Sequence, residues 1–89
     1  MKANYIRIST VEQNTARQET GKNDFIDKCS GSIAFTERTQ GGKLIALAKN
    51  GELSGVAVNS IDRLGRNLID IKTTIDFFTS CGVLLSIII

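Results

Sequence analysis

Histidine is absent from the 89-residue chain, and cysteine occurs only twice. The lack of histidine excludes a Ser-His-Asp triad, a histidine general base and a histidine-based metal cluster. Cys29 and Cys81 lie far apart with no CxxC spacing, so we expect two reduced thiols rather than a disulfide framework or a metal site. Any chemistry must therefore use Ser, Arg, Asp, Glu or Lys side chains.

Long apolar runs and a strong excess of charge are also missing. No stretch approaches the roughly 18 apolar residues that span a membrane, and the N-terminus lacks the apolar region of a signal peptide. We therefore expect a cytoplasmic protein without membrane contact. The formal net charge is only +2, too small to indicate a nucleic-acid binder by bulk charge. Such a function would need local clustering of basic residues.

The residues that are present fit one small folded domain over positions 1–89. Hydrophobic residues make up 42% and charged residues 22% of the chain, which is typical of globular proteins rather than disordered ones. A chain of this length buries a modest fraction of its surface, so a second domain is excluded.

Strand and helix patterns alternate along the chain. Short runs rich in strand-forming residues occur at residues 3–8, 25–26, 56–58 and 83–89. Helical patterns lie between them, at residues 12–22, 44–51 and 67–82. This order predicts an α/β fold with a mostly parallel sheet of about four strands flanked by helices, joined by right-handed crossovers.

The expected helices differ in how clearly they are marked. The first has few large apolar residues and should be weakly packed. The second ends at Gly51, a typical position for a glycine after a helix. Asn67 can cap the third, whose face would contain Leu68, Ile71, Ile75 and Phe78. Residues 33–42 lack periodicity and include a Gly-Gly pair, so we expect a mobile loop there.

Polar side chains follow two of the predicted strands. Arg7 and Ser9 alternate with Ile8 and should point to the same side of the first strand. Asp62, Arg63 and Arg66 follow the third strand, at the edge where open α/β sheets bind ligands. Arginine keeps its charge and its planar fork matches phosphate oxygens. One carboxylate cannot neutralise two guanidinium groups, so the arrangement requires an anionic partner or a further network of carboxylates.

A serine among several arginines suits attack on a phosphodiester. Serine is a weak nucleophile unless its proton is removed or the product is stabilised. Phosphoryl transfer depends mainly on positioning and on electrostatic stabilisation of the equatorial oxygens. The expected constellation is Ser9 with Arg7, Arg63 and Arg66, joined by Arg38 if the loop folds over.

Each of these features also has an ordinary structural explanation. Ser9 with its neighbour could be a loop or helix cap, and an isolated Asp-Arg pair is usually a surface salt bridge of little energetic weight. The Gly41-Gly42-Lys43 run does not fit the Walker pattern, so we reject a phosphate loop there. Taken alone, composition and spacing support a phosphate-binding α/β domain, which leaves a small phosphatase or a nucleotide-binding domain open.

Three ordered motifs resemble those of serine recombinases of the resolvase/invertase family. They are YIRIST with EQNTARQ at residues 5–18, FIDKCSG at residues 25–31 and IDRLGR at residues 61–66. The resemblance extends over nearly the whole chain and implies an α/β catalytic domain with a mostly parallel sheet.

The resemblance also implies roles for individual residues. Ser9 matches the serine that attacks DNA and forms a 5′-phosphoserine link without ATP, metal or other cofactor. Arg7 matches the arginine beside it, and the Asp-Arg-x-x-Arg set around the scissile phosphate is matched by Asp62, Arg63 and Arg66. Two polar residues near that site are matched by Gln13 and Gln18. The loop cation of the family is matched by either Arg38 or Lys43.

The family's longer members continue beyond a fourth strand into further sheet, a dimerisation helix and a DNA-binding domain. The chain stops on the apolar run 86–89, so we expect a catalytic domain truncated at its C-terminus and inactive alone. DNA is the expected partner, and a dimer or tetramer is expected for the full-length protein. The alternative hypothesis is a non-catalytic module that binds phosphate, DNA or a recombinase partner.

Overall fold

The computed structural model describes residues 1–9 and 23–87. Along the chain, the elements are β1 (Lys2–Ile8), β2 (Asp24–Lys28), the 3-10 helix η2 (Phe35–Glu37), α1 (Thr39–Lys49), β3 (Gly55–Val58), the 3-10 helix η3 (Ile61–Leu64), α2 (Leu68–Ser80) and β4 (Leu84–Ile87). The helix expected over residues 12–22 lies outside the described residues.

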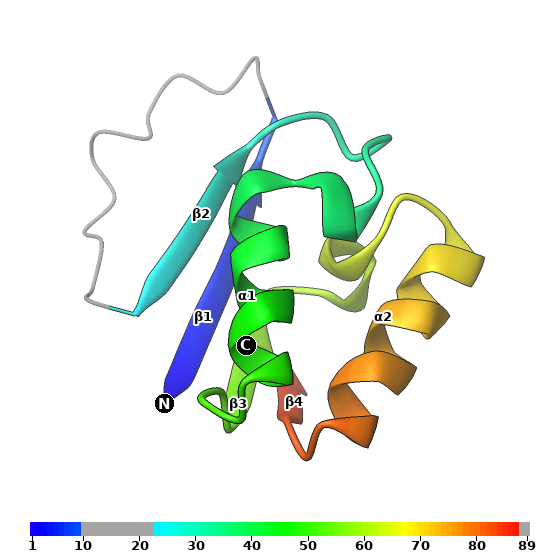
Figure 1. Ribbon diagram of the computed structural model, residues 1–89. Coiled ribbons are helices and arrows are strands. Elements are labelled where there is room, and N and C mark those ends of the chain that lie inside the picture. The colour runs from blue at the N-terminus through cyan, green and yellow to red at the C-terminus, as the bar shows by residue number, and fades with distance from the viewer. Residues whose placement is uncertain (10–22, 88–89) are drawn as a thin grey trace.

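The four strands form one sheet in the order β2-β1-β3-β4, and every neighbouring pair is parallel. The expected α/β class and parallel sheet are therefore confirmed. In Figure 1, α1 lies in front of the sheet and α2 lies beside it, near β4. Because parallel strands all point the same way, the ends of β1, β2 and β3 meet at one edge of the sheet.

The core lies between the sheet and the two α-helices. Alternate residues of β1 and β3, including Ala3, Tyr5 and Val56, face this layer and are buried. Three aromatic rings continue the core from the sheet to α2. The ring centroids of Tyr5 and Phe35 are 5.0 Å apart and those of Phe35 and Phe78 are 6.0 Å apart, and both pairs have edge-to-face geometry. Such pairs add to the stabilisation that burial of the rings already gives.

The expected mobile loop at residues 33–42 is wrong. This segment contains η2 and the first turn of α1, and Phe35 is fully buried. The N-cap position of α1 is Arg38, whose side chain makes no cap hydrogen bond. Instead, Asp27 of β2 accepts hydrogen bonds from the amides of Gln40 (2.8 Å) and Gly41 (3.0 Å). A carboxylate from another strand thus satisfies the amides that a local Ser or Asp would normally cap.

Gly41 is required by packing rather than by backbone conformation. A Cβ at this position would lie 2.5 Å from the carbonyl oxygen of Phe35, closer than a real Cβ can approach. At the neighbouring Gly42, the nearest atom would be the Thr36 carbonyl oxygen at 3.3 Å. The absence of a side chain at Gly41 therefore lets α1 begin directly against η2.

We expect Gly41→Ala to lower the free energy of unfolding by more than about 1 kcal/mol, although alanine normally favours a helix interior by roughly that amount. Gly42→Ala is the matched control, because it gains the same helix propensity with a milder contact. Urea denaturation of both variants measures the difference. A Gly41→Ala chain as stable as Gly42→Ala would contradict the close packing of α1 against η2.

The ends of the helices agree with the sequence patterns. Asn67 caps α2 by accepting a hydrogen bond from the Asp70 amide (2.8 Å). Gly51 and Gly82 follow α1 and α2 with φ of 73° and 77°, in the left-handed region that glycine adopts readily. Leu68 is 82% exposed and does not belong to the buried face as expected. It lies in the first turn of α2, and the buried face of the helix is centred further along, at Thr74 and Phe78.

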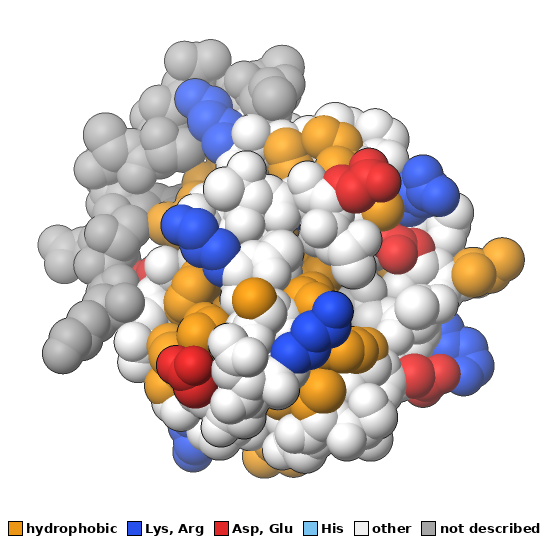
Figure 2. All heavy atoms as spheres, viewed as in Figure 1, with side chains coloured by type: hydrophobic (Ala, Val, Ile, Leu, Met, Phe, Trp, Pro, Cys, Tyr) orange, Lys and Arg blue, Asp and Glu red, His pale blue; other side chains and the backbone are white. Residues whose placement is uncertain are grey.

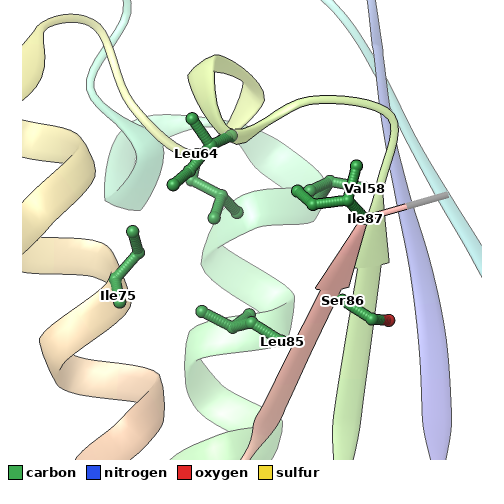
Figure 3. A pocket seen from close by; sticks show the side chains of 7 residues that line it. Val58, Leu64, Ile75, Leu85, Ser86 and Ile87 are labelled. Carbon is green, nitrogen blue, oxygen red and sulfur yellow. The ribbon is translucent and has the colours of Figure 1, made fainter. Parts of the chain in front are cut away.

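An apolar pocket of about 220 Å³ lies between η3, α2 and β4. Figure 3 shows the side chains that line it, including Leu64, Ile75 and Leu85. None of its lining residues is charged, so it is not an anion site.

In the described part of the chain, no helix is long and apolar enough to cross a membrane.

Candidate functional site

Ser9 directly follows β1 and is half-buried. The segment that carries Asp62 and Arg63 is η3, which is separated from the end of β3 by two residues. Because β1 and β3 are parallel, the two segments leave the sheet at the same edge, and η3 contacts β1. The predicted nucleophile and the predicted arginine loop therefore lie at one edge of the sheet.

Arg7 connects the end of β1 to the turn after β2. Its Nη1 donates a hydrogen bond to the carbonyl oxygen of Cys29 (2.9 Å). Its guanidinium lies against Gly31, where an added Cβ would be 3.5 Å from Cζ. Its Nε is buried and has no hydrogen-bond partner among the described residues. One donor of this cation is therefore left for an acceptor.

Arg38 is only 3% exposed, and its guanidinium holds several segments together. Nη1 donates to the carbonyl oxygen of Arg63 (2.6 Å) and to the phenol oxygen of Tyr5 (3.3 Å). Nε donates to the carbonyl oxygen of Ile33 (2.9 Å), and Nη2 donates to that of Gly31 (3.4 Å). The side chain thereby joins β1, the turn after β2 and η3.

Tyr5 and Asp27 complete this buried network, and neither was among the predicted site residues. The Tyr5 hydroxyl donates to Asp27 Oδ2 (2.9 Å) while it accepts from Arg38. Burial raises the pKa of the Tyr5 phenol, so the group stays neutral and can make both hydrogen bonds. Asp27 is 5% exposed and also caps α1. An acidic residue directly after the strand predicted at residues 25–26 was the feature of the sequence that could have revealed this role.

Asp62 lies at the surface in a positive environment. The Ser60 hydroxyl donates a hydrogen bond to Asp62 Oδ1, and this bond holds the pKa of the carboxyl below its usual range. Desolvation opposes this shift, and the charges of Arg63 and Arg7 lower the pKa of Asp62 to a lesser extent. Asp62 is therefore ionised at neutral pH and lies within electrostatic reach of arginines from two different segments.

We expect Ser60→Ala to raise the pKa of Asp62 toward the value of about 3.9 found in model peptides. The hydrogen bond stabilises the ionised form, so its contribution is present above that value and disappears as the pH falls through the lower folded pKa. A carbon-detected NMR titration of the Asp62 carboxyl measures the change. Ser54→Ala is the control, because the Ser54 hydroxyl donates to the carbonyl oxygen of Met1 instead. An unchanged Asp62 pKa in Ser60→Ala would contradict the assigned cause.

The remaining predicted residues lie differently. The Arg66 side chain is exposed in the loop before α2, and Lys43 is exposed on α1. Gln13 and Gln18 lie outside the described residues. Between the two candidates for the loop cation, Arg38 is the one that contacts the Arg63 backbone.

In the described part of the chain, no carboxylate forms a direct ion pair with an arginine of the site. Within residues 1–9 and 23–87, the ion pair found is Lys72 with Asp76 on α2. Over the same residues, no group of three or more metal-ligating side chains occurs. On the face shown in Figure 2, basic and acidic side chains are interspersed. Arg7, Arg38 and Arg63 form a local cluster of positive charge at the end of the sheet. Such a cluster attracts a small anionic group.

The family described as the resolvase N-terminal domain matches residues 2–88. This chain belongs to the resolvase family of serine recombinases. The match spans every described strand and helix, and it includes Ser9 and the arginine loop after β3.

Several resolvases and recombinases are similar in sequence. The Transposon Tn21 resolvase of Escherichia coli is 44% identical over 82 residues, which cover 89% of this chain and 42% of that protein. The Transposon Tn501 resolvase of Pseudomonas aeruginosa is 38% identical over 82 residues, with the same coverage. The serine recombinase PinR of Escherichia coli strain K12 is 36% identical over 89 residues, which cover 89% of this chain and 44% of PinR. The chain thus spans less than half the length of these relatives.

The fold agrees with this membership. The C-terminal catalytic domain of ISC1926 TnpA, an IS607-like serine recombinase, matches with a TM-score of 0.74 over 98% of this chain and 70% of that chain. The sequences are 22% identical, so this likeness concerns the fold alone.

Proposed function

We propose that this chain is a catalytic domain for site-specific DNA recombination, in which Ser9 Oγ is the nucleophile. The observation that carries the proposal is the meeting of Ser9 with the Arg7, Arg38 and Arg63 segments at one edge of the sheet. Membership of the resolvase family supports DNA as the substrate. The relatives' printed names, resolvase and serine recombinase, agree with this chemistry.

In the proposed reaction, Ser9 Oγ attacks the phosphorus of a DNA phosphodiester. The new Oγ–P bond replaces the bond from phosphorus to the 3′ oxygen, which leaves as a hydroxyl. One proton departs from Ser9 and one reaches the 3′ oxygen, so the step needs no outside reactant. A 3′ hydroxyl from another strand then attacks the 5′-phosphoserine, which restores Ser9 and rejoins the DNA. One phosphodiester is exchanged for another, so bond energy is conserved and no ATP is required.

The arginines would stabilise the charge that develops on the equatorial oxygens. Arg63 and Arg66 lie in a loop that reaches solvent, and the Arg7 guanidinium lies at the same edge of the sheet. Asp62 is ionised at neutral pH, so it serves better as an acceptor that orients these cations than as a proton donor.

Arg38 has a different role in this proposal. Most of its N–H donors are bonded to protein oxygens and its side chain is buried, so a full phosphate contact would require it to leave the Arg63 and Ile33 carbonyls. We therefore assign Arg38 to positioning the η3 loop. In a longer protein, a dimer or tetramer would bring the second DNA strand to the site.

We expect Ser9→Ala to abolish covalent protein–DNA adducts. The assay uses a recombinase of the relatives' full length that carries this chain, with nicked suicide substrates built from DNA that the wild-type protein selects from a random library. Ser32→Ala is the matched control, because the Ser32 hydroxyl contacts Ser30 in the turn after β2 and should leave adduct formation intact. Adducts that persist in Ser9→Ala would remove Ser9 as the nucleophile.

We expect Arg63→Ala and Arg66→Ala each to slow strand cleavage at least tenfold, which corresponds to about 1.4 kcal/mol of transition-state stabilisation. Single-turnover cleavage of the same substrates measures the rate. Lys72→Ala removes an equal charge from the outer face of α2, where the side chain is 77% exposed, and should leave the rate unchanged. If Arg63→Ala and Arg66→Ala reduced the cleavage rate only as much as Lys72→Ala does, the result would show that the overall charge matters and not the position of these arginines.

A non-catalytic module that binds phosphate or DNA is the second candidate. The observation in its favour is the buried guanidinium of Arg38, most of whose N–H donors are bonded to oxygens of the chain itself in this conformation. The two functions are separated by the adduct assay: a module that only binds retains DNA under conditions where no covalent species forms.

A further inference from the structure

Asp70 joins two loops that are far apart in the sequence. One of its carboxylate oxygens, Oδ2, accepts a hydrogen bond from the Phe35 amide (3.1 Å) and another from the Arg66 amide (2.9 Å). Phe35 opens η2, three residues before Arg38, whereas Arg66 lies in the loop after β3. A single carboxylate on α2 thus holds the backbone of both arginine-bearing segments.

The position of this carboxylate is fixed by its surroundings. Asp70 lies in the first turn of α2, where its own amide donates to the Asn67 cap. Gly65 makes the close approach possible, because a Cβ there would lie 2.9 Å from Asp70 Oδ2 and 2.6 Å from the Ile71 amide nitrogen. The half-buried carboxylate cannot move far without losing both hydrogen bonds.

The two hydrogen bonds do not serve the end of α2 itself. In a capping box, the acidic side chain in the first turn accepts from the amide of the N-cap residue. Here it accepts from Arg66, which precedes the Asn67 cap, and from Phe35 in a different segment. The carboxylate therefore connects the loops beyond the helix rather than completing the helix end.

We propose that Asp70 is a positioning residue that fixes the spacing between the Arg38 segment and the Arg63–Arg66 loop. The proposal rests on the proposed function, because that spacing matters when both loops surround one phosphate. The hydrogen bond from Arg38 Nη1 to the Arg63 carbonyl is the second link between the same two segments. Because Asp70 and Arg38 each link the two segments, the segments move as one unit. The rigid element that carries them is α2.

The consequence for catalysis follows from geometry. A displacement of about 1 Å at a reacting centre can cost roughly a hundredfold in rate. Loss of the hydrogen bonds to Asp70 lets the Arg66 backbone move relative to η2. The protein keeps all of its arginine charges. Affinity for DNA, which depends mainly on charge, should then change little, whereas the cleavage step should slow.

The first experiment measures the link itself by amide hydrogen exchange in the 89-residue chain. In Asp70→Ala, exchange at the Phe35 and Arg66 amides should become at least about tenfold faster, because each loses a hydrogen bond to a charged acceptor. Asp70→Asn keeps an oxygen that can accept both bonds and should restore most of the protection. Asn67→Ala is the matched control: it weakens the start of α2 without touching Asp70 Oδ2, so protection at Phe35 should persist.

The second experiment measures the functional consequence in the full-length recombinase with the suicide substrates described above. Asp70→Ala should slow adduct formation at least tenfold with a DNA dissociation constant within about twofold of wild type, and Asp70→Asn should recover the rate. The proposal is overturned if Asp70→Ala leaves the two amides protected, if Asn67→Ala reproduces both effects, or if affinity and rate fall together.

The two proposals fail in different ways. If Ser9→Ala retains its adducts, the nucleophile assignment is wrong although the exchange data still report the link. If Ser9→Ala abolishes adducts and Asp70→Ala reacts at the wild-type rate, the proposed function stands and the role of Asp70 is wrong.

Discussion

The carboxylate of Asp27 is the contact on which the arrangement of the site depends. It is buried near the end of β2, where it caps α1 and accepts a hydrogen bond from the Tyr5 hydroxyl. The Tyr5 oxygen in turn accepts a hydrogen bond from Arg38. A buried charge is tolerated only when it is well paired, and three donors around Asp27 meet that condition. Loss of this one group would leave α1 without its cap. It would also remove the acceptor of the Tyr5 hydroxyl, which is a hydrogen-bond partner of Arg38. The start of the helix and the position of the arginine are therefore parts of one network.

Several features of the fold could be predicted from local patterns because their causes are local. The end of α1 at Gly51 and the Asn67 cap each depend on residues close together in sequence, and the parallel sheet follows from the alternation of short strand and helix patterns along the chain. The start of α1 could not be predicted in this way. Its N-cap is an arginine, and its capping group comes from Asp27 twelve positions before Thr39. A glycine pair that weakens helix propensity was overruled by tertiary packing against η2.

The site was predictable to a similar degree. Alternation along β1 and the rule for parallel sheets were enough to bring Ser9, Arg7 and the η3 loop to one edge. The roles of Tyr5 and Asp70 were not predictable, because each makes a hydrogen bond to a residue in a distant segment, Tyr5 to Asp27 and Asp70 to Phe35. The structure thus adds the hydrogen bonds that hold the arginine-bearing segments in place, whereas the sequence motifs predict which arginines belong to the site.

The burial of Arg38 has a consequence for how its guanidinium could meet an anion. Its hydrogen bonds to the carbonyl oxygens of Ile33 and Arg63 hold two segments of the chain in place. Exchanging these bonds for bonds to an anion would release both segments, so access to this cation is coupled to the conformation of the chain around it.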